Sequence, residues 1–235
     1  MRTVLPFHPP IDPDELAALI VLEYITKQEF YKREKPDLNS VDNKIGVEVT
    51  RAYLSEYELY NGKIISDVLK GIIRTTPQVR LFTASVDKAL ERIKDRIVDK
   101  MQKLYGYDQY SLNYLYVKSL IWSFYCELHT LPNMFDMLKE QIIQTCENAK
   151  DEIGIAIPYK QFDIVLLECA DMFIIWDWNN NSLMFRPDVF EEYKNQCHNI
   201  FRLISDEIDT GFLAVNNTPL KSINRLLSEE RRCII

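Results

Sequence analysis

The sequence predicts a mixed α/β fold built around one sheet, and three stretches carry this prediction. Residues 86–104 repeat apolar side chains at helical spacing. Residues 45–50 alternate branched apolar residues with Gly, Glu and Thr, which is typical of a strand. Residues 162–168 and 172–178 are two short apolar runs, and the turn-rich sequence NNNS follows the second. Helices and strands in such a mixture pack as layers around a common sheet.

At the front of the chain we expect a helix and then a hairpin. Residues 13–33 open with a Pro-Asp-Glu start signal after an aspartate cap, and the residue before Pro36 disfavours helix. Residues 37–52 follow as an extended run with a turn at VDNK. In this hairpin Asp37 lies near the edge of one strand, and Glu48 lies inside the next.

The rest of the chain continues with both kinds of element. We expect helices over residues 55–74, 86–104, 134–152 and 187–205, and strands over residues 111–121, 162–168 and 172–178. With 235 residues and no linker rich in glycine, serine or proline, the chain is expected to form a single domain over residues 1–235. Its core covers about residues 13–180, and extra C-terminal helices cover about residues 185–235.

Composition narrows the compartment and the kinds of partner. The N-terminal stretch holds no apolar run longer than the seven residues LAALIVL, so we expect neither a signal peptide nor a membrane segment. Five scattered cysteines without a CxxC pair predict reduced thiols in a cytoplasmic protein. The three histidines are isolated, which argues against a zinc site built on histidine.

The charge of the chain restricts how it could contact nucleic acid. A net charge of −7 argues against binding by the whole surface. Residues 88–103 nevertheless hold six basic and three acidic residues. The net charge therefore does not exclude a local basic face on this predicted helix that contacts nucleic acid.

Asp37 and Glu48 are the strongest candidates for chemistry. Two carboxylates on neighbouring strands can approach to about 4 Å, where they repel by roughly 4 kcal/mol at an effective dielectric constant near 20. Such a pair needs a shared proton, a basic partner or a bound cation, and carboxylate oxygens suit Mg²⁺ or Mn²⁺. The alternative is that Asp37 caps a turn and that Glu48 is solvated.

Glu23 is a third candidate, because it falls on the apolar face of the first predicted helix. A carboxylate buried there without a partner would cost several kcal/mol. It is therefore either a further ligand for the same metal or a side chain at the rim of that face.

The run PDLNSVDNKIGVEVT, residues 36–50, resembles the signature of the PD-(D/E)XK nuclease superfamily, which has the restriction-endonuclease-like fold. That signature is a Pro-Asp pair, a loop, and a strand carrying Glu-x-Lys after apolar residues. The segment IGVEVTRA, residues 45–52, is similar to sequences from families of small bacterial proteins assigned to the superfamily. The resemblance implies a central mixed sheet flanked by helices, and it covers residues 35–52, with looser support from residues 13 to about 120.

On this resemblance, Asp37 and Glu48 match the metal-binding acids, and Glu23 matches a helix glutamate that some members use. The implied reaction is metal-dependent hydrolysis of phosphodiester bonds, with Mg²⁺ or Mn²⁺ as cofactor and DNA as the expected substrate. Many nucleases of this fold dimerise, so the resemblance also allows a homodimer.

The sequence departs from the signature at Thr50, which stands where the motif lysine is expected. That lysine neutralises developing charge or orients water, whereas a threonine can only hydrogen-bond to the substrate. Lys100 on the helix over residues 86–104 is our candidate replacement, and Lys103 is the second choice. Both are alternatively solvated lysines of a helix with mixed charge.

Two other functions stay open at this point. The missing lysine favours a non-catalytic member of the same fold that binds a protein or a nucleic acid. The acidic balance also suits an interaction protein without nuclease ancestry.

Overall fold

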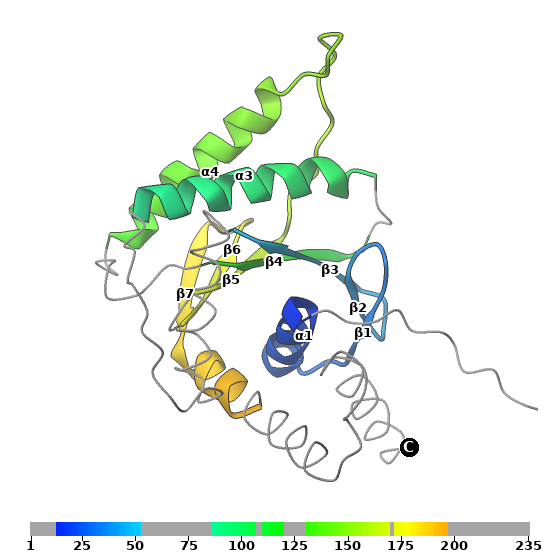
Figure 1. Ribbon diagram of the computed structural model, residues 1–235, viewed down its shortest axis with the longest axis vertical. Helices are drawn as coiled ribbons and strands as arrows, with labels where there is room; N and C mark the ends of the chain where they lie inside the picture. Colours follow the sequence, from blue (N-terminus) through cyan, green and yellow to red (C-terminus); the bar gives the residue numbers. More distant parts are fainter. Residues whose placement is uncertain (1–12, 53–85, 107–109, 120–129, 170–171, 197–235) are drawn as a thin grey trace, which may run out of the picture.

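The computed structural model describes residues 13–52, 86–106, 110–119, 130–169 and 172–196 (Figure 1). A seven-stranded sheet runs through this part, and its strands lie side by side in chain order. The strands are β1 (Phe30–Lys32), β2 (Leu38–Ser40), β3 (Ile45–Arg51), β4 (Leu112–Lys118), β5 (Ile164–Glu168), β6 (Phe173–Asp177) and β7 (Ser182–Arg186). The helices are α1 (Pro13–Thr26), α3 (Val86–Leu104) and α4 (Leu131–Asn148), and residues 187–196 are also helical.

The sheet is mixed, which confirms the predicted α/β class. Strands β1, β2 and β3 are antiparallel neighbours, and so are β5, β6 and β7. The central strands β3, β4 and β5 are parallel to one another. Each parallel connection carries a helix, because a chain that re-enters a sheet in the same direction must cross over one face. Helix α3 lies in the first crossover and α4 in the second.

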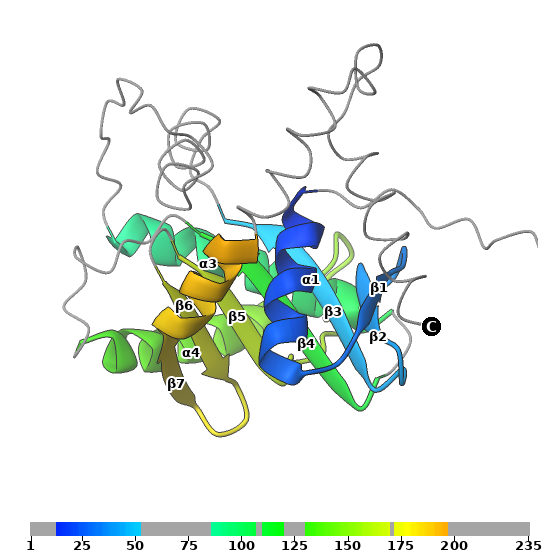
Figure 2. The ribbon, with the colours of Figure 1, turned by 90° about the horizontal axis from the view of Figure 1, so that it is seen from below.

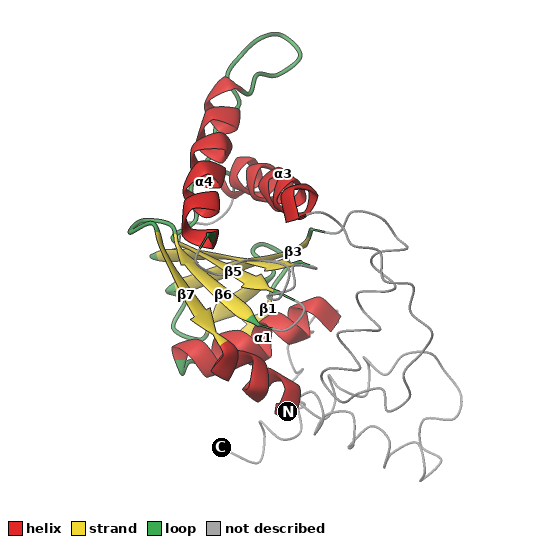
Figure 3. Cartoon of the chain, turned by 90° about the vertical axis from the view of Figure 1, so that its left-hand side faces the viewer, coloured by secondary structure: helices red, strands yellow, loops and turns green. Residues whose placement is uncertain are grey.

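Helices cover both faces of the sheet and create two cores. Helices α3 and α4 lie on one face, and α1 lies with the helix over residues 187–196 on the other (Figures 1 and 2). A view from the side shows the sheet between these two layers (Figure 3). Alternation along β4 divides its side chains between the cores: Leu115 and Val117 pack under α3 and α4, and Tyr116 packs toward α1.

The first helix is shorter than predicted. It ends at Thr26, because Lys27 takes a left-handed backbone conformation (φ 56°) and its N–H bonds to the carbonyl of Glu23 at 3.0 Å. The expected helical end, residues 27–33, instead contains strand β1, in which the fully buried Phe30 pairs with Ser40. Pairing with the following strand, β2, therefore overrode the helical pattern here.

The predicted hairpin is confirmed. Strand β2 pairs with β3 in an antiparallel register that sets Leu38 opposite Val47, and Glu48 lies inside β3. Asp37 immediately precedes β2. The predicted strands after residue 110 are also present, but β7 was missed, because this short edge strand is only half buried and follows a turn.

Other predicted helices are present only in part, or they fall outside the residues that the structure describes. The helix predicted over residues 134–152 is α4, which begins three residues earlier and ends at Asn148. Of the helix predicted over residues 187–205, only 187–196 is within the described ranges. The predicted helix over residues 55–74 lies outside the described residues, as does most of the C-terminal addition. None of the helices in the described ranges combines the length and apolar character that a membrane-crossing segment requires.

Candidate functional site

One edge of β3 forms the starting point of the site. Strand β2 has only three residues, and only Gly46 and Val47 of β3 pair with it. Beyond this point the carboxylate of Asp37 takes the place of a neighbouring strand: its Oδ2 accepts a hydrogen bond from the N–H of Val49 at 2.8 Å. The short β2 strand thus leaves the end of β3 open and fixes Asp37 beside it.

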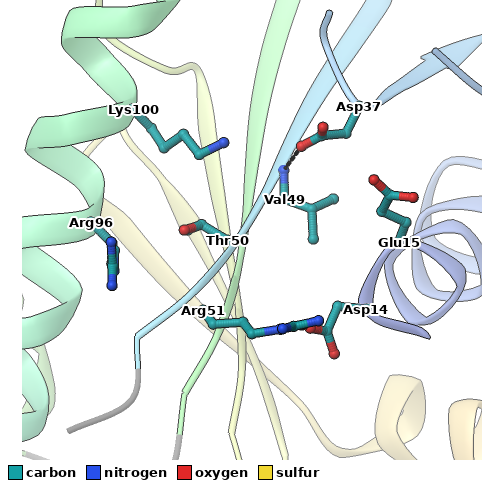
Figure 4. A pocket seen from close by; sticks show the side chains of 8 residues that line it. All are labelled: Asp14, Glu15, Asp37, Val49, Thr50, Arg51, Arg96 and Lys100. Atoms are coloured by element: carbon teal, nitrogen blue, oxygen red, sulfur yellow. Dashed lines mark hydrogen bonds and ion pairs between the residues drawn. The ribbon is translucent and has the colours of Figure 1, made fainter. Parts of the chain in front are cut away.

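A cavity of about 390 Å³ lies at this open edge, between α1 and α3 (Figure 4). Its walls carry opposite charge: basic residues come from α3 and from Arg51 of β3, and acidic residues come from α1 and from Asp37, which precedes β2. The residues lining it are Asp14, Glu15, Asp37, Val49, Thr50, Arg51, Arg96 and Lys100. Both faces of the sheet therefore meet at this cavity, because the edge strand that would separate them is too short.

Glu48 is buried beside the cavity and faces α3. Its side chain faces away from Val47 and Val49, which pack toward α1, and the residue is only 2% exposed. The ammonium of Lys100 donates a hydrogen bond to its Oε2 at 2.6 Å. Burial and the negative charge of Asp37 raise the pKa of Glu48, and Lys100 opposes this rise. A carboxylate in such surroundings attracts positive charge strongly.

Thr50 lies two residues after Glu48 on β3, so its side chain is on the same side of the strand. It lines the cavity close to Lys100 (Figure 4). The structure therefore places the ammonium of a helix residue near the position where the signature lysine is missing. Lys103 behaves differently: its ammonium pairs with Asp99 on the surface of α3 at 2.8 Å and affects Glu48 only through longer-range charge.

Glu23 does not line the cavity. Its Oε1 accepts a hydrogen bond from the N–H of Phe30 at 3.0 Å, which ties the end of α1 to the start of β1. The prediction that Glu23 lies with the other two acids was based on its place on the apolar face of the helix and on the resemblance. The cavity lies instead at the other end of α1, where Asp14 and Glu15 line it.

Glu15, one of the acids that sequence reasoning missed, reaches the cavity from α1. It forms an ion pair with Lys32 of β1, and the Lys32 ammonium also lies 4.0 Å from Oδ1 of Asp37. Figure 4 shows the Glu15 carboxylate on the same side of the cavity as Asp37, opposite Lys100 of α3. Its only signal in the sequence is an acidic residue in the first turn of a helix, which ordinarily indicates a favourable interaction with the helix dipole.

A row of charged residues crosses the sheet at the carboxyl ends of the three parallel strands. Arg51 is the neighbour of Lys118, and Lys118 is the neighbour of Glu168. All three belong to the α1 side, where Asp14 pairs with Arg51 and, at 3.1 Å, with Lys118. The hydroxyl of Tyr116 donates to the buried Glu168 at 2.7 Å, and its pKa is raised well above the usual range by burial and by that carboxylate.

This row was also missed by sequence reasoning. Its signal was the charged residue that ends each of two apolar strands, Lys118 and Glu168. Ion pairs from Asp14 link α1 to strands β3 and β4 and hold the first turn of the helix, and with it Glu15, at the cavity. The carboxyl ends of parallel strands are also a frequent location of ligand sites in α/β proteins.

The cavity offers carboxylate oxygens that could hold a metal ion. In the part of the chain that the structure describes, no three His, Cys, Asp or Glu side chains converge as a ligand group. Asp37 and Glu48 are nevertheless close enough for the charge of one to raise the pKa of the other. Mg²⁺ is commonly held by one or two carboxylates together with waters and substrate phosphates, so this pair fits such an ion.

Comparison with known proteins yields no relationship: no family model, curated protein or solved structure matches the chain.

Proposed function

We propose that the protein is a metal-dependent nuclease that hydrolyses phosphodiester bonds in DNA, with a restriction-endonuclease-like core. The observation that carries the proposal is the pairing of buried Glu48 with Lys100 beside Asp37. The signature in β2 and β3 supplies two acids but has Thr50 in place of the lysine. The ammonium of Lys100 lies on α3, close to Thr50. This supports a site in which the lysine comes from a helix and not from β3.

Asp37 and Glu48 are the residues that would hold Mg²⁺ or Mn²⁺. When bound, such an ion polarises the scissile phosphate and lowers the pKa of the attacking water. The raised pKa of Glu48 supports this assignment, because a cation removes the cost of its buried negative charge. Glu15 takes the helix position that the resemblance suggested for Glu23, since it lines the cavity on the same side as Asp37.

Lys100 and Thr50 have separate roles in this proposal. The Lys100 ammonium stabilises the negative charge that develops on the phosphate, and this effect is large in a site that excludes water. The Thr50 hydroxyl donates a hydrogen bond to a phosphate oxygen and so orients the substrate. Lys103 takes neither role in this proposal, because its ammonium pairs with Asp99 on the surface of α3.

The non-catalytic alternative is favoured by one specific observation. Lys100 already neutralises Glu48 through a 2.6 Å ion pair, and Lys32 lies near both Asp37 and Glu15. A site whose acids are each balanced by a lysine does not require a cation for its stability. In that case the cavity would be a binding surface on the same fold.

The test is plasmid cleavage by the purified protein with Mg²⁺ or Mn²⁺, compared with the same reaction in chelator. Glu48→Gln should abolish cleavage, because it removes a ligand charge with little change in volume. Glu23→Gln is the matched control, since it makes the same chemical change on α1 outside the cavity, and it should cleave like the wild type. Absence of cleavage with every divalent cation, or cleavage that survives Glu48→Gln, would refute the proposal.

We further propose a homodimer, because cutting both strands of a duplex needs two sites or two events. Light scattering of the purified protein gives its mass in solution. The mass of a single chain would contradict the homodimer.

A further inference from the structure

Helix α3 carries a basic ridge that leads into the cavity. Lys88, Arg92, Arg96 and Lys100 recur at every fourth residue, and the first three are exposed. Residues four apart on a helix lie about 6 Å apart along its axis and differ by about 40° around it, so the four side chains form one continuous stripe. The last two, Arg96 and Lys100, line the cavity (Figure 4).

A second stripe on α3 has the opposite charge. It consists of Asp87, Glu91, Asp95 and Asp99, each one position before a member of the basic ridge. One position corresponds to about 100° around the helix axis, so the acidic stripe faces more toward the outside of the molecule. The apolar stripe of α3 packs on the sheet through residues such as Ile93 and Ile97. The basic ridge thus occupies the flank between the sheet and the acidic stripe, on the side of the open edge of β3.

We infer that this ridge binds the phosphate backbone of duplex DNA and guides it to the candidate site. The inference deepens the proposed nuclease function and rests on it for the identity of the partner. The three exposed cations of the ridge spread over about 12 Å of helix and match a regularly spaced line of negative charge that leads to Lys100. A protein with a net charge of −7 repels DNA over most of its surface, so a local basic stripe decides where DNA can approach.

Arg96 is the decisive member of the ridge. It is exposed, lines the cavity one helical turn before Lys100, and makes no ion pair within the residues that the structure describes. Arg92 in contrast lies 3.8 Å from Asp95, a pair that is half exposed and therefore weak. A phosphate held by Arg96 would be adjacent to the one held over Lys100 and Glu48. Arg96 is therefore a positioning residue, which acts on the substrate beside the reacting bond.

The experiment measures binding of a fluorescein-labelled DNA duplex by anisotropy, in chelator, at several salt concentrations. Arg92→Gln/Arg96→Gln should weaken binding about tenfold and lower the slope of log K against log salt by about 2, since each lost phosphate contact removes about 0.9. Arg96→Gln alone should lower the slope by about 1. Lys94→Gln is the matched control, because Lys94 lies on the same helix but off the ridge, and its binding should equal that of the wild type.

Several results would overturn the inference: no measurable DNA binding, an unchanged slope in the double variant, an equal loss in Lys94→Gln, or preference of the ridge for an RNA duplex. Cleavage with Mg²⁺ is measured in parallel and separates the two proposals. Binding that depends on the ridge without any cleavage refutes the nuclease and supports the ridge. Cleavage with wild-type binding and KM in the double variant supports the nuclease and refutes the ridge.

Discussion

The ammonium of Lys100 lies 2.6 Å from Oε2 of Glu48, although the two residues are 52 positions apart in the chain. Glu48 lies on a strand whose register fixes its direction, and Lys100 lies on the flank of a helix that packs on that strand. The contact joins an acid and a base that come from different elements of the fold. The Lys100 ammonium therefore balances the charge of the buried Glu48 carboxylate.

Replacement of Lys100 should reveal the cost of leaving Glu48 buried without its partner. Lys100→Met should lower the free energy of unfolding at pH 7 by about 3 kcal/mol, because an uncompensated buried charge is strongly unfavourable. Glu48→Gln/Lys100→Met should recover much of this loss, since neither side chain is then charged. Urea denaturation in chelator measures both variants, with Lys94→Met as the control on the same helix. If Lys100→Met and Lys94→Met lose the same unfolding free energy, the ion pair contributes nothing to stability.

Glu48 also makes stability depend on pH. Its pKa in the folded protein is raised above the ordinary value of 4.5, mainly by burial and by Asp37, so the folded state binds this proton more tightly than the unfolded state. The stability contributed by the proton is complete below pH 4.5 and is lost as pH rises through the folded-state pKa. Glu48→Gln cannot titrate. The unfolding free energy of the wild type minus that of Glu48→Gln should therefore decrease as pH rises from 4.5, in urea titrations at successive pH values. A difference that grows with pH would contradict the raised pKa.

Metal binding can be measured without any substrate. Mn²⁺ should bind the wild type at one site, detected by electron paramagnetic resonance or calorimetry, and both Asp37→Asn and Glu48→Gln should lose it. Because protons compete for Glu48, the affinity should fall as the pH is lowered toward the folded-state pKa of this residue. Glu23→Gln should bind like the wild type, since its carboxylate bonds to the Phe30 N–H away from the cavity. Unchanged binding by Glu48→Gln would place the ion elsewhere.

The charged row on the α1 side should be important for stability. Asp14→Ala removes the acid that pairs with Arg51 and Lys118, and we expect a loss of about 1.5–3 kcal/mol in the free energy of unfolding. Glu191→Ala removes a surface acid that pairs with Lys194 at i,i+3, and it should change stability by no more than about 0.5 kcal/mol. Chemical denaturation of the two variants under identical conditions makes the comparison. If Asp14→Ala loses no more unfolding free energy than Glu191→Ala, the ion pairs of the charged row do not stabilise the fold.

The sequence by itself determined the elements whose pattern is strong. The helical stripe of α3 and the alternation around Glu48 in β3 are local properties, because a period of 3.6 or of 2 fixes which side chains share a face. The same reasoning put Glu48 and Thr50 on one side of their strand and placed Lys100 on the flank of α3. Asp37 beside Glu48 followed from the short hairpin.

Only the tertiary structure decided which acids and bases meet. Phe30 pairs with Ser40 in the sheet and is not part of the predicted helix, and Glu23 bonds to its N–H. The cavity lies at the other end of α1, where Glu15 lines it. The charged row depends on the registers of three parallel strands, which are brought together by crossovers and not by neighbouring residues. The open edge of β3 exists because β2 stops after three residues. Such features result from pairing between distant segments, and the free energy of that pairing has no trace in the local pattern of one segment.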